Sequence, residues 1–126
     1  MEVTLARVGV LGGTFDPIHF GHLAVASEVC AELRLDQVLL TPAYSQPFKI
    51  GLDAAEPHHR LAMCELAAAD DDRLAVSPVD IERGGVTYTV DTLTDLHAQR
   101  PDTQLFFITG ADALARLDEW KDAERL

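Results

Sequence analysis

Basic residues, cysteines and aromatic side chains are all scarce in this chain. Its 126 residues include 10 Lys and Arg against 21 Asp and Glu, a formal net charge of -11 with neutral histidines. A surface this negative repels phosphate, so a broad nucleic-acid interface is excluded and any phosphate site must be local. No apolar run approaches a bilayer-spanning length, and the start MEVTLAR is too short and too polar for a signal peptide. We therefore expect a soluble, intracellular protein that binds neither nucleic acid nor membranes.

The two cysteines, Cys30 and Cys64, fall in segments with helical patterns and are far apart in the sequence. Neither has a second ligand at short spacing, which argues against a disulfide framework and a zinc knuckle. We expect both to be reduced core residues of a cytoplasmic protein. Hydrophobic residues make up 48% and charged residues 25%, which is ordinary for a globular chain and unlike a disordered acidic tail. The length predicts one domain over residues 1–126.

Short apolar runs alternate with helical patterns along the chain. Strands are predicted at 7–11, 37–41, 74–77 and 104–109, and helices at 21–33, 58–69, 89–99 and from near residue 111. The inward faces predicted for the first and third helices comprise Leu23, Ala26, Cys30 and Leu33, and Leu93 and Leu96. This alternation predicts a doubly wound α/β fold, a parallel sheet with helices on both faces. Such sheets bind ligands at the carboxyl ends of their strands, here after Leu11, Thr41 and Thr109.

The segment after the first strand, Gly12 to His22, carries most of the chemistry. Gly12 and Gly13 lack Cβ atoms, so the backbone is expected to turn sharply there and to bring its N–H groups close to a phosphate. His19 and His22 are three residues apart at the start of the predicted helix, beside its positive end. Imidazoles, exposed amides and a helix N-terminus together predict an anion site.

Other interpretations of this segment stay open. A Gly-Gly turn after a strand can be purely structural, and the two histidines could ligate a metal, although no third ligand stands at compelling spacing. Asp16 precedes a proline and can be an ordinary turn residue. The glycine spacing is neither that of the dinucleotide fingerprint nor that of the P-loop.

The segment GGTFDPIHFGH resembles the signature of the nucleotidylyltransferase superfamily, with its H-x-G-H element at 19–22. Within that superfamily the chain is most similar to the bacterial nicotinate-nucleotide adenylyltransferases. Further matches are Lys49, the segment YTVDTL at 88–93 and GAD at 110–112. The resemblance implies a Rossmann-like sheet and a reaction that joins ATP and nicotinate mononucleotide to give deamido-NAD and pyrophosphate. The attack on the α-phosphorus would be direct, so catalysis would consist of positioning and charge stabilisation.

The resemblance also implies roles for individual residues. His19, His22 and Lys49 would be catalytic, with Lys49 also at the mononucleotide; without the resemblance, Lys49 would be a solvated loop lysine. The expected ATP-binding residues are the two histidines with Gly12, Gly13, Thr14, Phe15, Gly110 and Asp112. Phe15 alone would be a core residue, and the alternative for the last two is a turn glycine and a helix N-terminal charge.

The expected mononucleotide-binding residues are Thr89, Asp91, Thr92 and Trp120, besides Lys49. The two threonines could instead cap a helix, and a lone tryptophan on a late helix could simply be packing. ATP implies Mg²⁺ held mainly by phosphate oxygens, so no protein ligand is assigned; the run at 70–72 is taken as a solvated helix end.

Two rival functions stay open: another member of the superfamily that transfers AMP to phosphopantetheine or CMP to a phosphorylated alcohol, and a nucleotide-binding module without turnover. His19 and the segment 88–93 favour the nicotinate substrate. Members of the superfamily continue past the point where this sequence stops, into a further ATP-contacting segment, so the chain is expected to lack its C-terminal part. Both a monomer and a homo-oligomer are compatible with the sequence.

Overall fold

The computed structural model describes residues 5–46 and 55–126. Its strands are β1 (Ala6–Gly13), β2 (Gln37–Pro42), β3 (Leu74–Val76) and β4 (Thr103–Ile108). Its helices are α1 (Phe20–Glu32), α2 (Pro57–Ala68), α3 (Val79–Arg83), α4 (Thr89–Gln99) and α5 (Ala111–Leu114), followed by single 3-10 turns at Leu117–Glu119 and Ala123–Arg125. The ends of the predicted elements agree with these bounds to within two residues. Only α3 was not predicted.

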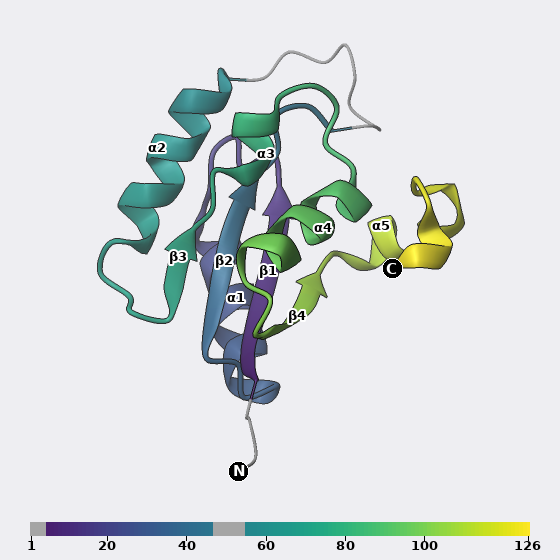
Figure 1. The fold of residues 1–126 in the computed structure, drawn as a ribbon. Helices are drawn as coiled ribbons and strands as arrows, with labels where there is room; N and C mark the ends of the chain where they lie inside the picture. The colour runs from purple at the N-terminus through teal and green to yellow at the C-terminus, as the bar shows by residue number, and fades with distance from the viewer. Residues whose placement is uncertain (1–4, 47–54) are drawn as a thin grey trace.

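The four strands form one parallel sheet in the order β3-β2-β1-β4 (Figure 1). In the register of the central strand, Leu11 of β1 lies between Leu40 of β2 and Ile108 of β4. The chain moves outward from β1 through β2 to β3 and then returns to the other side of β1. The direction of winding therefore reverses between β1 and β4, which is where doubly wound sheets bind their ligands. The predicted fold class is confirmed.

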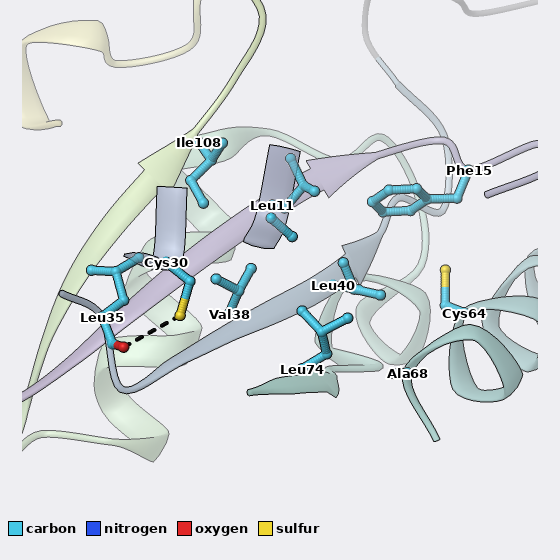
Figure 2. Close-up of a cluster of buried hydrophobic side chains, with 11 residues drawn as sticks. Leu11, Phe15, Cys30, Leu35, Val38, Leu40, Cys64, Ala68, Leu74 and Ile108 are labelled. Atoms are coloured by element: carbon cyan, nitrogen blue, oxygen red, sulfur yellow. Dashed lines mark hydrogen bonds between the residues drawn. The ribbon is translucent and has the colours of Figure 1, made fainter. Parts of the chain in front are cut away.

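Alternate residues of the strands point to opposite faces, and each face has its own core. On one face, Val38 and Leu40 pack with Ala26 and Cys30 of α1 and with Cys64 of α2 (Figure 2). On the other face, residues of β1 and β2 pack with Val79 of α3 and Leu96 of α4. Helices thus cover both sides of the sheet: in Figure 1, α1 lies behind the sheet and α4 in front.

Both cysteines are free thiols inside the core that contains α1 and α2. Cys30 donates from Sγ to the carbonyl of Leu35 at 3.3 Å (Figure 2). Burial raises the pKa of the Cys64 thiol to about 11, so this thiol stays protonated at neutral pH. Both observations agree with the prediction of reduced core residues.

Two expectations about local structure were wrong, and one helix was missed. Leu33 does not face the sheet, because α1 ends at Glu32 and the Leu33 side chain is exposed. Gly12 and Gly13 do not form a turn: they are the last residues of β1 and pair with Thr41 and Pro42 of β2. The chain turns instead at Phe15, which has a φ of 53°, and at the cis peptide before Pro17. The missed helix α3 is only five residues long, too short to display a helical period.

Candidate active site

A cavity of about 240 Å³ opens at the carboxyl ends of β1, β2 and β4, where the winding reverses. Its floor includes Gly12 and Gly13 of β1 and Phe107 of β4. A Cβ at Gly12 would lie 3.4 Å from the Phe107 ring, an ordinary van der Waals contact, so the ring alone does not require a glycine here. Several residues expected at the mononucleotide line the same cavity, namely Thr89, Thr92 and Trp120.

His19 and His22 form a reciprocal cap at the start of α1. The backbone N–H of Gly21 donates to Nδ1 of His19 at 3.1 Å, and the backbone N–H of His19 donates to Nδ1 of His22 at 3.1 Å. The two rings stack with centroids 3.9 Å apart and planes 29° from parallel. A nitrogen that accepts a hydrogen bond carries no proton, so each neutral ring holds its proton on Nε2. The pair therefore carries two N–H donors beside the positive end of a 13-residue helix.

His22 is the more buried member of the pair. Burial lowers its pKa, and the neighbouring His19 lowers it further. The Phe15 ring, only 2% exposed, meets the His22 ring edge-on at a centroid distance of 4.9 Å. The Phe15 side chain is thus a core residue, which was the alternative to a role in ATP binding, and it packs against the His22 ring. Its backbone lies in the loop beside the predicted anion site.

Gly21 is required by the position of the His19 ring. A Cβ at residue 21 would lie 2.9 Å from Cε1 and 3.0 Å from Nδ1 of His19, closer than real Cβ contacts. Both atoms belong to a ring that is held by its own hydrogen bond to Gly21. The glycine of the H-x-G-H element is therefore explained by contact with the first histidine.

Asp80 on α3 is a buried carboxylate in the cavity wall that the sequence did not reveal. It is 2% exposed and accepts hydrogen bonds at 2.7 Å from Thr92 Oγ1 and from Arg83 Nη2. Burial raises its pKa, against the lowering effect of these two donors. Thr92 thus does not cap α4, and Thr89 does not either, because Tyr88 is the N-cap and no side chain bonds the helix end. The threonines instead line the cavity, with Thr92 tied to Asp80.

Trp120 does not lie on a helix but just after the 3-10 turn at 117–119. Its Nε1 donates to the carbonyl of Ala113 at 3.2 Å, and its ring meets the Phe107 ring edge-on at 5.9 Å. Lys121 follows it at the cavity wall, with its ammonium 4.9 Å from the centroid of the Tyr88 ring and 3.3 Å from Asp91 Oδ2. Tyr88, Phe107 and Lys121 are cavity residues to which the sequence analysis gave no role, since aromatic and lysine side chains there resemble ordinary core and surface residues.

The other described site residues that were predicted do not line the cavity, and these include Thr14, Phe15, His19 and His22. Gly110 and Asp112 are exposed at the start of α5, and neither lines the cavity, although Thr109 and Ala113 on either side of them do. Asp91 lies at the rim, paired with Lys121. Thr14 Oγ1 is buried and has no hydrogen-bond partner among the described residues. Lys49 lies outside the described residues.

The structure describes no helix that is long and apolar enough to cross a membrane. Among residues 5–46 and 55–126, no three His, Cys, Asp or Glu side chains come together as a metal-binding group. The polar groups offered by the histidine pair are N–H donors, which suit phosphate oxygens and do not ligate a cation.

Several known proteins are similar to this chain in sequence. A protein of Leifsonia xyli subsp. xyli named "Probable nicotinate-nucleotide adenylyltransferase" is 51% identical over 126 residues, covering 99% of this chain and 62% of the relative. A Roseiflexus protein of the same name is 54% identical over 121 residues, covering 96% and 60%. A Mycobacterium tuberculosis protein of that name is 52% identical over 119 residues, covering 94% and 55%. The chain thus spans 55–62% of the length of these relatives.

Solved structures share the fold at low sequence identity. A crystal structure from Vibrio parahaemolyticus superposes with a TM-score of 0.78 at 18% identity, covering 96% of this chain and 68% of the other. The Plasmodium falciparum nicotinic acid mononucleotide adenylyltransferase complexed with NaAD superposes with a TM-score of 0.78 at 21% identity, covering 95% and 59%. The cytidylyltransferase-like family model matches residues 10–126, from the middle of β1 through the last 3-10 turn. On this match and these relatives, the chain belongs to the cytidylyltransferase-like family.

Proposed function

We propose that this protein is a nicotinate-nucleotide adenylyltransferase, which joins ATP and nicotinate mononucleotide to give deamido-NAD and pyrophosphate. The observation that carries the proposal is the capped histidine pair, which holds two Nε2–H donors at the start of α1, a few residues after the end of β1 that lines the cavity. The names of relatives at 51–54% identity support the same activity. A structural neighbour bound to NaAD supports the product.

In this proposal the histidine pair binds phosphate oxygens of ATP and stabilises the charge that develops during transfer. Because each imidazole donates from Nε2 while Nδ1 is occupied, the rings approach the phosphates in a fixed orientation. The carboxyl end of β1, from Gly12 to Phe15, lies alongside the nucleotide, and Lys49 acts as a further cation over the phosphates. Gly110 and Asp112 contact the adenosine, where a carboxylate can accept from ribose hydroxyls.

The cavity is assigned to the mononucleotide. Its wall offers the hydroxyls of Thr89 and Thr92 for polar contacts and the Trp120 ring for stacking on the pyridine. Asp91 acts from the rim through its pair with Lys121. In this proposal the two phosphates meet between the cavity and the start of α1, and positioning them there supplies much of the rate enhancement.

Magnesium is proposed to enter with ATP. The described groups nearest the phosphate position are N–H donors, so they fit phosphate oxygens and not the ion. Substrate oxygens and water would hold Mg²⁺, which would neutralise charge on the phosphates. The cytoplasmic setting expected from the reduced cysteines belongs to the same proposal.

The test compares pyrophosphate release from ATP with nicotinate mononucleotide, nicotinamide mononucleotide and phosphopantetheine side by side, and adds CTP with a phosphorylated alcohol. We expect release with a pyridine mononucleotide and none with the other acceptors. Release only with phosphopantetheine or only with CTP would move the protein to another branch of the family. Nucleotide binding without release from any pair would support a module that binds without turnover.

A further inference from the structure

Arg60 is a buried cation that joins three separate parts of the chain. Its side chain, on α2, is 2% exposed and donates four hydrogen bonds, all to backbone carbonyls. Nη1 donates to Thr14 at 2.8 Å and to Ala43 at 2.6 Å, Nη2 donates to Tyr44 at 3.1 Å, and Nε donates to Ala55 at 2.9 Å. One guanidinium therefore links the loop after β1, the loop after β2 and the start of α2.

The acceptors of the Arg60 guanidinium are backbone carbonyls and not carboxylates. None of the ion pairs formed within residues 5–46 and 55–126 includes Arg60, and the guanidinium keeps its charge in proteins. Burial lowers its pKa, while the nearby Asp16 acts in the opposite direction. An apolar side chain of similar volume would fill the same space without the cost of burying a charge. An apolar side chain could not donate the hydrogen bonds that the guanidinium makes, so we take these donors to be the reason for an arginine at this position.

The linked loops are the ones that carry the site. Thr14 follows Gly13, and Gly13 and Ala43 both line the cavity. The carbonyl of Gly13 also accepts from the backbone N–H of Ala43 at 2.9 Å, and within the described residues no later backbone bond joins the two strand ends. Beyond it, Arg60 is the group that sets how far the two loops diverge. Arg60 itself does not line the cavity.

A second bond ties the same loop to the same helix. Asp16 Oδ2 accepts from the backbone N–H of Ala55 at 3.0 Å, two residues before α2 begins. The loop that leads from β1 to His19 is thus anchored to α2 at Thr14 and at Asp16. Movement of α2 would be transmitted to the loop and through it to the histidine pair.

We propose that Arg60 is a positioning residue whose guanidinium fixes the spacing between the β1 and β2 loops, and with it the alignment of the two substrates. This inference rests on the proposed adenylyl transfer for its kinetic consequence, but its structural part stands independently. A lysine at this position keeps the charge and most of the apolar stem, yet its single ammonium cannot reach four carbonyls in three directions. Arg60→Lys and the uncharged Arg60→Gln are therefore the test variants.

The matched control is Leu74→Ala. Leu74 is buried in the same core under α2 and forms no hydrogen bond to either loop, so its truncation destabilises the protein without loosening the loops directly. All variants are compared at a temperature where each is fully folded by circular dichroism. If Arg60→Gln does not fold, Arg60→Lys, the milder change, decides the outcome.

Kinetics and hydrogen exchange are measured together. We expect kcat of Arg60→Lys to fall ~100-fold, since small misplacements of reacting groups can cost that much, while kcat of Leu74→Ala stays close to wild type. Amides of residues 13–16 and 43–46 should exchange faster in Arg60→Lys than in Leu74→Ala. Equal kcat in the two folded variants, or unchanged exchange of these amides, would overturn the inference. A wild-type protein without turnover would count against the proposed function instead, and the exchange data would still decide whether Arg60 holds the loops.

Discussion

The substitution Gly21→Ala should lower activity while leaving the free energy of unfolding nearly unchanged. The new Cβ would lie 2.9 Å from Cε1 of His19, so the imidazole must rotate or shift and its hydrogen bond from the residue 21 amide is lost. A hydrogen bond of this kind contributes about 0.5–1.5 kcal/mol. Replacing a helical glycine by alanine returns about 0.5–1 kcal/mol. The two effects nearly cancel, so the free energy of unfolding should change by less than about 1 kcal/mol.

Activity should respond very differently. If the His19 Nε2–H contacts the transferring phosphate, moving the ring removes an oriented donor, and loss of one such donor costs about 10²–10³ in kcat. The assay is pyrophosphate release with ATP and nicotinate mononucleotide, alongside urea unfolding of the same preparation. Wild-type turnover in Gly21→Ala would refute the assignment of His19 to the reaction.

A double-mutant cycle shows whether the effect passes through the imidazole. In a His19→Ala background there is no ring for the new Cβ to displace, so adding Gly21→Ala should cost almost nothing further. Independent, additive losses in the two single variants would mean that Gly21 acts by another route, such as direct contact of its backbone with ATP.

Three further outcomes are expected. His22→Ala should lower turnover by at least ~100-fold, and unchanged turnover would remove this side chain from the mechanism. The pKa of His22 is lowered on folding, so the unfolded chain takes up a proton first as the pH falls; stability should be complete above the unfolded value of 6.5 and decline below it, and His22→Gln should flatten that decline in urea unfolding at pH 7.5 and 5.5. Thr92→Val removes a donor from the buried carboxylate of Asp80 and should cost about 1.5–3 kcal/mol of unfolding free energy. Thr94→Val is its control on the same helix, because the Thr94 hydroxyl donates only to the backbone carbonyl of Val90; equal losses in both variants would show that the carboxylate does not depend on Thr92.

The sequence predicted the fold well because the relevant signals are local. Short apolar runs mark every strand and helical periods mark every helix of three turns or more, and helix α4 was predicted to the residue. The helix Val79–Arg83 escaped because five residues hold little more than one helical turn. Leu33 was placed in the core because nothing in its own periodicity shows that α1 stops one residue earlier.

The site was predicted in part, and the missed parts are those set by tertiary contact. The spacing of His19 and His22 correctly placed both residues at a helix start. It did not predict the hydrogen bond that each Nδ1 accepts. Asp80 and Arg60 carry no motif of their own in the sequence analysis. Their importance comes from burial and from partners that include residues as far as 12 and 46 positions away. Such roles become visible only when the chain is folded.

The acidity of the chain bears directly on the ATP binding proposed above. The capped histidines offer N–H donors, and the Arg60 guanidinium is engaged by four carbonyls. A helix N-terminus supplies only about half an elementary charge. The chain as a whole has a formal net charge of -11, so we expect these groups and Lys49 to leave most of the polyphosphate charge uncompensated.

ATP should therefore bind as its magnesium complex, in which the ion has already neutralised part of that charge. We expect calorimetry with a non-hydrolysable ATP analogue to show at least ~10-fold tighter binding with Mg²⁺ than with EDTA, a difference of about 1.4 kcal/mol. Binding of the mononucleotide alone, with one phosphate to accommodate, should change far less. Equal affinity of the analogue with and without the ion would mean that the protein's own groups compensate the polyphosphate, and a triple variant at His19, His22 and Lys49 would then be the next measurement.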